Sequence, residues 1–252
     1  MGALSEYFSK QHYSNKETHT MKETIPVLDF TSASLIYTNE ELSDDRPPDL
    51  KESYNITQID HDGINWPEEV PQFKHIMTTI YKRLHSLARR MLRLIAIGLD
   101  IEDEEYFYPF HQFVGSDNFS TLRSLFYPNV IGKEIKPQQL RCAEHSDYCS
   151  VTLLFQDDIG GLEVMTRNKV YIPATPQPGC VLINIGELMQ KWTGNKIIAA
   201  KHRVILPEDP ASQAAERRSF AFFLHPDNIA NVKSVFDEDD VPVNALKSLV
   251  YD

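Results

Sequence analysis

The chain has 252 residues, of which 42% are apolar and 24% are charged, close to the average of globular proteins. This composition excludes a fully disordered chain, a collagen and a coiled coil, and the length allows one domain or two. The net charge of −11 argues against nucleic acid or an anionic membrane as the main partner.

The sequence predicts that the N-terminal part of the chain is mostly polar and loosely structured. Residues 1–24 are expected to form a polar tail without the apolar run of a signal peptide. The segment IPVLDF at 25–30 has the apolar, partly β-branched character of a short strand. Residues 39–66 are acidic and contain prolines, which predicts a loop.

The region 25–120 is expected to be mostly helical. Apolar residues recur three and four positions apart over 68–99 and predict one long amphipathic helix. Pro67 suits its beginning and Gly98 its end. A second, shorter helix is predicted over 101–113. The sequence contains no run of about 18 apolar residues, so no membrane span is predicted.

From residue 121 the hydrophobic period changes to two. Short strands separated by turn residues predict an antiparallel jelly roll. We therefore expect a mainly β fold with N-terminal helices, with a double-stranded β-helix (jelly-roll) core over 121–230 and a C-terminal segment over 231–252. The expected strands are TLRSLFY, LRCAEH, SVTLLFQ, GLEVMT, KVYIPA, GCVLINIG, KIIAAKHRVI and RRSFAFFLH.

Three cysteines, Cys142, Cys149 and Cys180, form no Cys-x-x-Cys pair. An odd number at this low density indicates a reducing compartment rather than a disulfide framework. We therefore expect a cytoplasmic protein.

A candidate metal site begins with His145 and Asp147, in the strand-like run EHSDYCSVTLLF. The period of two in a strand places both side chains on one face. His202, on another predicted strand, is the candidate third ligand. Two histidines and one carboxylate suit non-haem Fe(II), and zinc remains chemically open.

A candidate anion clamp lies in ERRSFAFFLHP, where Arg217 and Ser219 share a strand face. A guanidinium and a hydroxyl on one face can bind a carboxylate through charge-assisted hydrogen bonds. Arg218 alternates to the other face. The competing interpretation of Arg217 is an ordinary salt bridge to one of the 36 acidic residues.

Three segments in this order resemble the isopenicillin N synthase-like family of Fe(II)/2-oxoglutarate-dependent dioxygenases. The segments are HSDYCSVTLLFQDDIGGLEV, PQPGCVLINIGELMQKWTGNKIIAAKHRV and RRSFAFFLHPD. LRSLFYP looks like the family's strand that ends in Tyr-Pro, and IPVLDF looks like its opening motif.

The resemblance implies a role for each matched residue. His145, Asp147 and His202 would hold Fe(II). Arg217 and Ser219 would bind the distal carboxylate of 2-oxoglutarate, and Tyr127 would add a hydroxyl to that carboxylate or to a substrate. It further implies O₂ as cosubstrate, allows ascorbate as an additional cofactor, and predicts hydroxylation of a small organic molecule with succinate and CO₂ as coproducts.

The sequence departs from the family between IPVLDF and DRPPDL, where several tens of residues are missing. This departure keeps a second reading open, a truncated, non-catalytic jelly-roll paralogue that binds a ligand or partner. A zinc site in a hydrolase or cupin-like scaffold is a third reading. Two members of the family bind a substrate carboxylate or an activator with the matching Arg and Ser, so 2-oxoglutarate is one of two candidates for this clamp.

Overall fold

A computed structural model of the chain describes residues 46–60, 64, 66–114, 117–236 and 243–244. The polar tail expected over 1–24, the strand expected at 25–30 and the shortened segment that follows it lie outside the described residues.

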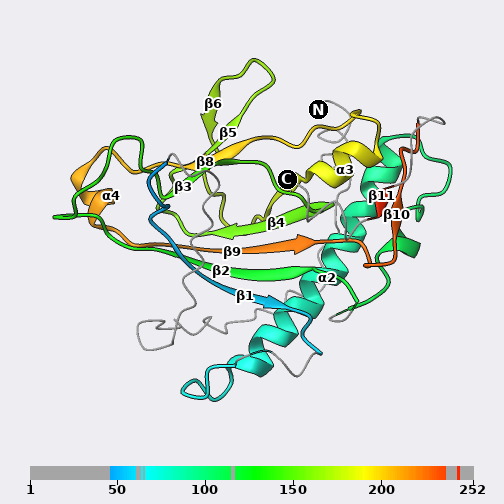
Figure 1. Cartoon of the computed structure of the whole chain (residues 1–252), viewed down its shortest axis with the longest axis horizontal. Helices are drawn as coiled ribbons and strands as arrows, with labels where there is room; N and C mark the ends of the chain where they lie inside the picture. Colours follow the sequence, from blue (N-terminus) through cyan, green and yellow to red (C-terminus); the bar gives the residue numbers. More distant parts are fainter. Residues whose placement is uncertain (1–45, 61–63, 65, 115–116, 237–242, 245–252) are drawn as a thin grey trace, which may run out of the picture.

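Two antiparallel sheets form the body of the molecule (Figure 1). The larger sheet has five strands in the order β1-β2-β9-β4-β7. Their bounds are β1 Glu52–Thr57, β2 Thr121–Tyr127, β9 Arg217–Leu224, β4 Val151–Gln156 and β7 Leu182–Ile185. The smaller sheet has four strands in the order β3-β8-β5-β6. Their bounds are β3 Cys142–His145, β8 His202–Val204, β5 Leu162–Met165 and β6 Tyr171–Pro173. The jelly-roll class expected from the short alternating strands is thereby confirmed.

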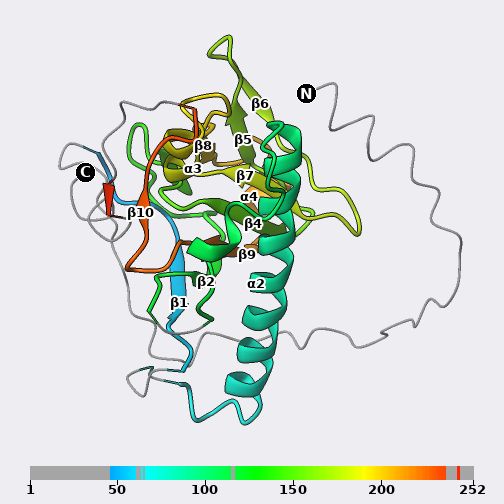
Figure 2. The ribbon, with the colours of Figure 1, turned by 90° about the vertical axis from the view of Figure 1, so that its right-hand side faces the viewer.

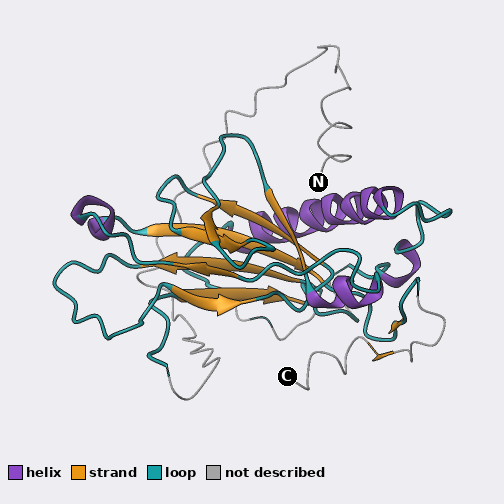
Figure 3. Cartoon of the chain, turned by 90° about the horizontal axis from the view of Figure 1, so that it is seen from above, coloured by secondary structure: helices purple, strands orange, loops and turns teal. Residues whose placement is uncertain are grey.

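The long helix α2, Phe73–Gly98, runs along the side of the five-stranded sheet (Figures 2 and 3). Shorter elements complete the described part of the chain. They are η1 Tyr108–Phe110, α3 Glu187–Trp192, α4 Pro210–Ala214, β10 Asn231–Val232 and β11 Val243–Asn244. Within this part of the chain, no helix combines the length and the hydropathy that a membrane span requires.

The alternation of side chains along the larger sheet separates a core face from a cavity face. Leu122, Leu153 and Phe222 are fully buried in the main hydrophobic core together with the apolar side of α2. The rings of Tyr81 on α2 and Phe222 on β9 meet edge to face, with 5.1 Å between centroids. The neighbouring residues on each strand point the other way. The helix and the sheet therefore support each other on one side and leave the opposite side of the sheet for the site.

Two helix predictions need correction at their ends. The long helix begins at Phe73 rather than at residue 68, because Pro71 disfavours helical geometry at the residue before it. The helix expected over 101–113 is reduced to the single turn of η1. Pro109 lies in that turn and offers no backbone N–H for a longer helix.

The prediction of a loop over 39–66 is wrong for residues 52–57. This segment is β1, which pairs antiparallel with β2 along its full length. Ser53 and Ile56 are its buried residues, so the hydrophobic pattern is too sparse to reveal the strand. Pairing with a neighbour far along the chain decides the conformation here. The strand expected over 196–205 is likewise shortened to His202–Val204.

Candidate functional site

A cavity of about 460 Å³ opens between the two sheets. Its walls include alternate residues of β2 and β9 on one side and residues of β3, β5 and β8 on the other. The candidate metal ligands lie in its wall, and the candidate anion clamp lies in the same cavity. The fold therefore brings both groups of residues predicted from the sequence into one space.

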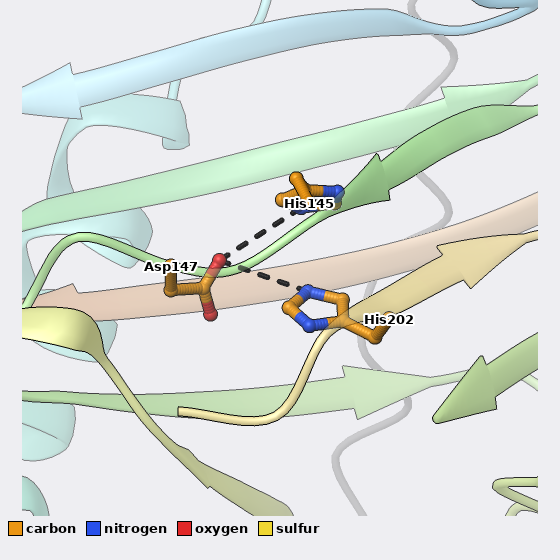
Figure 4. A group of neighbouring side chains, drawn as sticks. All are labelled: His145, Asp147 and His202. Atoms are coloured by element: carbon orange, nitrogen blue, oxygen red, sulfur yellow. Dashed lines mark ion pairs between the residues drawn. The ribbon is translucent and has the colours of Figure 1, made fainter. Parts of the chain in front are cut away.

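His145, Asp147 and His202 converge within this cavity (Figure 4). One ligand atom from each lies within 4.8 Å of the others. The Oδ1 atom of Asp147 is 3.8 Å from Nε2 of His145 and 3.7 Å from Nε2 of His202. Since one ion with bonds of about 2.1 Å can join two atoms up to about 4.2 Å apart, a single metal ion can reach the carboxylate and each imidazole.

Backbone carbonyls fix the tautomer of both imidazoles. Nδ1 of His145 lies 2.8 Å from the carbonyl oxygen of Ala143, and Nδ1 of His202 lies 3.1 Å from that of Ala200. A carbonyl oxygen only accepts hydrogen bonds, so Nδ1 carries a proton in both rings and Nε2 is the nitrogen left to face a metal. Burial, opposed by the attraction of Asp147, lowers the pKa of His202. The neutral imidazole that results is the form that binds a metal.

Asp147 is held from the five-stranded sheet, although it does not lie on a strand. Thr152 Oγ1 and Asn184 Nδ2 each donate a hydrogen bond of 2.6 Å to its Oδ2. The thiol of Cys149 lies 3.2 Å from Thr152 Oγ1, and burial raises the pKa of this thiol well above its usual range. The protonated thiol therefore donates to Thr152, which in turn donates to Asp147.

The expectation that a strand carries both His145 and Asp147 is wrong for Asp147. β3 ends at His145, and Asp147 lies in the loop before β4. The backbone N–H of Glu187, the first residue of α3, donates to the carbonyl oxygen of Asp147 at 2.7 Å. This contact holds the loop against the helix, so Asp147 meets His145 through loop geometry and not through strand alternation.

The donor set fits Fe(II). Two imidazole nitrogens and one carboxylate oxygen, brought together from two segments of the chain, form the ligand pattern that leaves coordination positions open on non-haem iron. The hydrogen bonds of Asp147 and the two histidines to their neighbours are the outer contacts that such sites require. These three residues are thus the candidate metal centre.

Arg217 lies at one end of the cavity and is 1% exposed. Its Nε donates to the carbonyl oxygen of Gly160 at 2.9 Å, its Nη1 to Ser219 Oγ at 3.3 Å and its Nη2 to Gln156 Oε1 at 3.0 Å. All three partners are neutral. A buried cation held by neutral groups is costly unless an anion joins it, so this end of the cavity is suited to a carboxylate. Arg218 is exposed, as its alternation predicted.

Tyr127 lies beside Arg217, and the two are paired across β2 and β9. The guanidinium carbon of Arg217 is 4.9 Å from the centre of the Tyr127 ring. Burial raises the pKa of Tyr127 to about 12, so its hydroxyl keeps its proton and can donate a hydrogen bond. Lys51 also lines this end and pairs with Asp49 at 2.8 Å.

Sequence reasoning missed Thr152, Asn184 and Lys51. Asn184 belongs to the quoted segment VLINIG, and Thr152 faces the cavity by simple alternation with Leu154 on β4. Both could have been marked as cavity residues, but their contact with Asp147 depends on the loop. Lys51 precedes a strand that the sequence did not reveal.

A model of the 2OG-Fe(II) oxygenase superfamily matches residues 105–226. Among curated proteins, the chain is similar to the 2-oxoglutarate-Fe(II) type oxidoreductase ppzD of Metarhizium majus, with 38% identity over 166 residues. This match covers 64% of this chain and 46% of that protein. The chain is 34% identical over 195 residues to the proline hydroxylase buaE of Petromyces alliaceus, covering 74% of this chain and 60% of that protein. The chain thus spans about half the length of the ppzD relative.

The chain also resembles a solved structure in both sequence and fold. A full-length Neurospora crassa protein, crystallised in complex with alpha-KG and 5-formyluracil, is 34% identical and superposes with a TM-score of 0.73. The match covers 81% of this chain and 68% of that chain. The two-sheet fold described above is therefore shared with a protein that was crystallised with alpha-KG.

Proposed function

Because this chain belongs to the 2-oxoglutarate-Fe(II) oxygenase superfamily, we propose that it is an Fe(II)- and 2-oxoglutarate-dependent dioxygenase that oxidises a small organic molecule. Hydroxylation is the proposed outcome, in which the substrate, 2-oxoglutarate and O₂ give the hydroxylated product, succinate and CO₂. The order of the sequence motifs supports a place among the isopenicillin N synthase-like members. We place the oxygenase core at residues 121–230, after the N-terminal region 25–120.

The observation that carries this proposal is the convergence of two residue sets in one cavity. His145, Asp147 and His202 offer three ligand atoms for Fe(II). Bound there, Fe(II) supplies the activation of O₂ that is coupled to decarboxylation of the 2-oxo acid. The protein itself fixes the orientation of the two imidazoles through their Nδ1 contacts with backbone carbonyls and holds Oδ1 of Asp147 toward them.

Arg217, Ser219 and Tyr127 are the proposed binding residues for the distal carboxylate of 2-oxoglutarate. The buried guanidinium supplies the positive charge that its neutral neighbours do not balance, and the two hydroxyls add hydrogen-bond donors. The Neurospora crassa relative was crystallised with alpha-KG, another name for 2-oxoglutarate, which supports 2-oxoglutarate as the ligand of this cavity.

The other end of the cavity is the proposed substrate end. It is lined by apolar groups such as Ala221 and Phe223 and by polar groups such as Thr121 and His225. This mixture is typical of a site for a small organic molecule. Curated relatives include a proline hydroxylase, which supports a small-molecule substrate here.

The two competing readings explain less of the site. A non-catalytic paralogue would not need two imidazoles that face a carboxylate in the same cavity as a buried arginine with only neutral hydrogen-bond partners. A zinc hydrolase would give His145, Asp147 and His202 a role but none to Arg217 and Ser219.

We also propose that the protein is cytoplasmic, with neither nucleic acid nor a membrane as partner. Its free cysteines and acidic charge support that location.

An anaerobic titration tests the proposal. Fe(II) and then 2-oxoglutarate are added to the purified chain while the weak visible charge-transfer band of the chelate is recorded. We expect the band in the wild-type chain and its loss in His202→Ala. Under air, the wild-type chain should also form succinate from 2-oxoglutarate, slowly without substrate. A folded wild-type chain that gives neither band nor succinate would contradict the proposal.

A further inference from the structure

A second buried arginine lies beside the proposed cosubstrate end of the cavity. Arg141 immediately precedes β3 and is 0% exposed, while Arg217 is 1% exposed. Both rank among the largest fully buried side chains of the described residues. Arginine is almost never fully buried unless its charge is paired, so two such side chains in one region need a physical account.

The hydrogen bonds of Arg141 are incomplete. Its Nη2 donates to the carbonyl oxygen of Ala215 at 2.8 Å. Its Nε and Nη1 are buried without a hydrogen-bond partner among the described residues. A buried N–H group of a cation that lacks an acceptor costs free energy. The bond to Ala215 alone therefore does not explain why a full guanidinium is kept at this position.

The two guanidinium groups also repel each other. Burial and the positive charge of Arg217 both lower the pKa of Arg141, while Asp157 and Tyr127 act in the opposite direction. Asp157 is already engaged, because its Oδ2 accepts from the backbone N–H of Arg218 and its Oδ1 from that of Ile159. Lys51 adds a further cation that Asp49 balances. Positive charge therefore exceeds nearby negative charge at this end.

We propose that Arg141 is a positioning residue of the cosubstrate site, a second guanidinium that acts through Arg217 and Tyr127 to favour 2-oxo acids with a distal carboxylate. The inference rests on the function proposed above and adds a residue to it. Arg141 does not line the cavity, so it acts through its charge on these two cavity residues. The incoming carboxylate relieves the repulsion between the two arginines, which strengthens its binding.

This arrangement has a consequence for stability. In the absence of an anion, the protein bears the cost of two buried cations that repel each other and of the unsatisfied N–H groups of Arg141. Replacing a buried charge of this kind with an apolar side chain of similar volume is often neutral or stabilising. Arg141 should therefore lower the stability of the protein without cosubstrate and raise its affinity for the dianion. A purely structural arginine would have the opposite effect on stability.

The test compares two 2-oxo acids that differ only at the distal end. Dissociation constants for 2-oxoglutarate and for 2-oxopentanoate, which has a methyl group in place of the distal carboxylate, are measured anaerobically with Fe(II) present. In Arg141→Met, we expect the preference for 2-oxoglutarate to fall about tenfold, or about 1.4 kcal/mol. The unfolding temperature without cosubstrate should be unchanged or higher. Arg141→Lys keeps the charge and should stay within about threefold of the wild-type preference.

Two further variants complete the test. Arg218→Met removes an exposed arginine at the same end and should leave the preference unchanged. Arg141→Gln repeats the neutralisation if Arg141→Met does not fold. An unchanged preference, equal weakening of both acids, or failure of both neutral variants to fold would overturn the inference. A wild-type chain that binds neither acid would instead overturn the proposed function.

Discussion

Thr152 donates its hydroxyl hydrogen to Oδ2 of Asp147, with 2.6 Å between the two oxygens. Asn184 donates to the same oxygen from the neighbouring strand. Because Oδ2 is occupied in this way, Oδ1 is the atom that faces both imidazoles. The candidate metal centre thus joins the two sheets. The histidines come from the smaller sheet, and the orientation of the carboxylate comes from the larger one.

Loss of the Thr152 hydroxyl should weaken metal binding. In Thr152→Val the shape of the side chain is kept, but Asp147 loses one of its two donors and can rotate. Outer contacts of this kind are worth about tenfold to a hundredfold in metal affinity. We expect an increase of about tenfold in the Fe(II) dissociation constant, measured by anaerobic titration. Thr152→Ser keeps the hydroxyl and should bind Fe(II) as the wild type does. Equal affinities in the Val and Ser variants would show that the hydrogen bond has no such role.

Arg217 and Arg218 form a matched pair, since they are adjacent on β9 but face opposite ways. Arg217→Ala removes the proposed carboxylate clamp and should raise the KM for 2-oxoglutarate about tenfold to a hundredfold, the range for a lost hydrogen bond to a charged group. Arg218→Ala removes an exposed side chain that pairs with Glu216 and should change KM little. The measurement is succinate formation as a function of 2-oxoglutarate concentration. Equal effects of both variants would refute the clamp.

Gly186 should tolerate no side chain, for a steric reason. A Cβ atom at this position would lie 1.8 Å from the carbonyl oxygen of Cys149, in the loop that carries Asp147. We expect Gly186→Ala to lower the free energy of unfolding by about 1–3 kcal/mol, as overpacking does, and to weaken Fe(II) binding.

The control for this prediction is Gly132→Ala. A Cβ atom there meets nothing within 4 Å, although the positive φ of +73° makes the variant strained. Gly132→Ala should therefore lose some stability in a denaturant titration while its Fe(II) affinity stays at the wild-type value. Unchanged Fe(II) affinity in folded Gly186→Ala would show that the packing of Gly186 against this loop does not affect the metal centre.

Two buried histidines should make the fold sensitive to acid. Burial, with the nearby Arg89, lowers the pKa of His85 to about 4, and burial lowers the pKa of His111 to about 3. Both are neutral in the folded protein at pH 7. Because the unfolded chain takes up protons near pH 6.5 and the folded protein does not, this stability is fully present above pH 6.5. It is lost as the pH falls toward the folded pKa values.

The loss at pH 5 amounts to about 2 kcal/mol for each histidine. Denaturant unfolding at pH 7 and pH 5 measures it. His85→Gln should reduce the difference between the two pH values, whereas replacement of the exposed His75 on the same helix by Gln should not. Equal stability of the wild type at both pH values would refute this prediction.

The local spacing of apolar residues was sufficient to predict the helix and strands that bury one face. The spacing of apolar residues along α2 and the period of two along β2, β4 and β9 are visible in the sequence because each element packs one side against the common core. The same alternation correctly separated Arg217 and Ser219 from Arg218. Patterns failed where burial is slight, as in β1, whose conformation is decided by pairing with β2.

The sequence by itself determined the residue types of the site: two histidines, an aspartate, and an arginine with a serine two positions away. Residue types and their spacing along the chain are properties that a sequence motif contains directly. The tertiary structure decided how they are held, since the aspartate is oriented by Thr152 and Asn184 from two strands of the larger sheet, and Arg217 is buried among neutral partners that include Gly160 and Gln156. Orientation and charge density depend on which segments meet in space, and a sequence pattern carries no such information for residues that are distant along the chain.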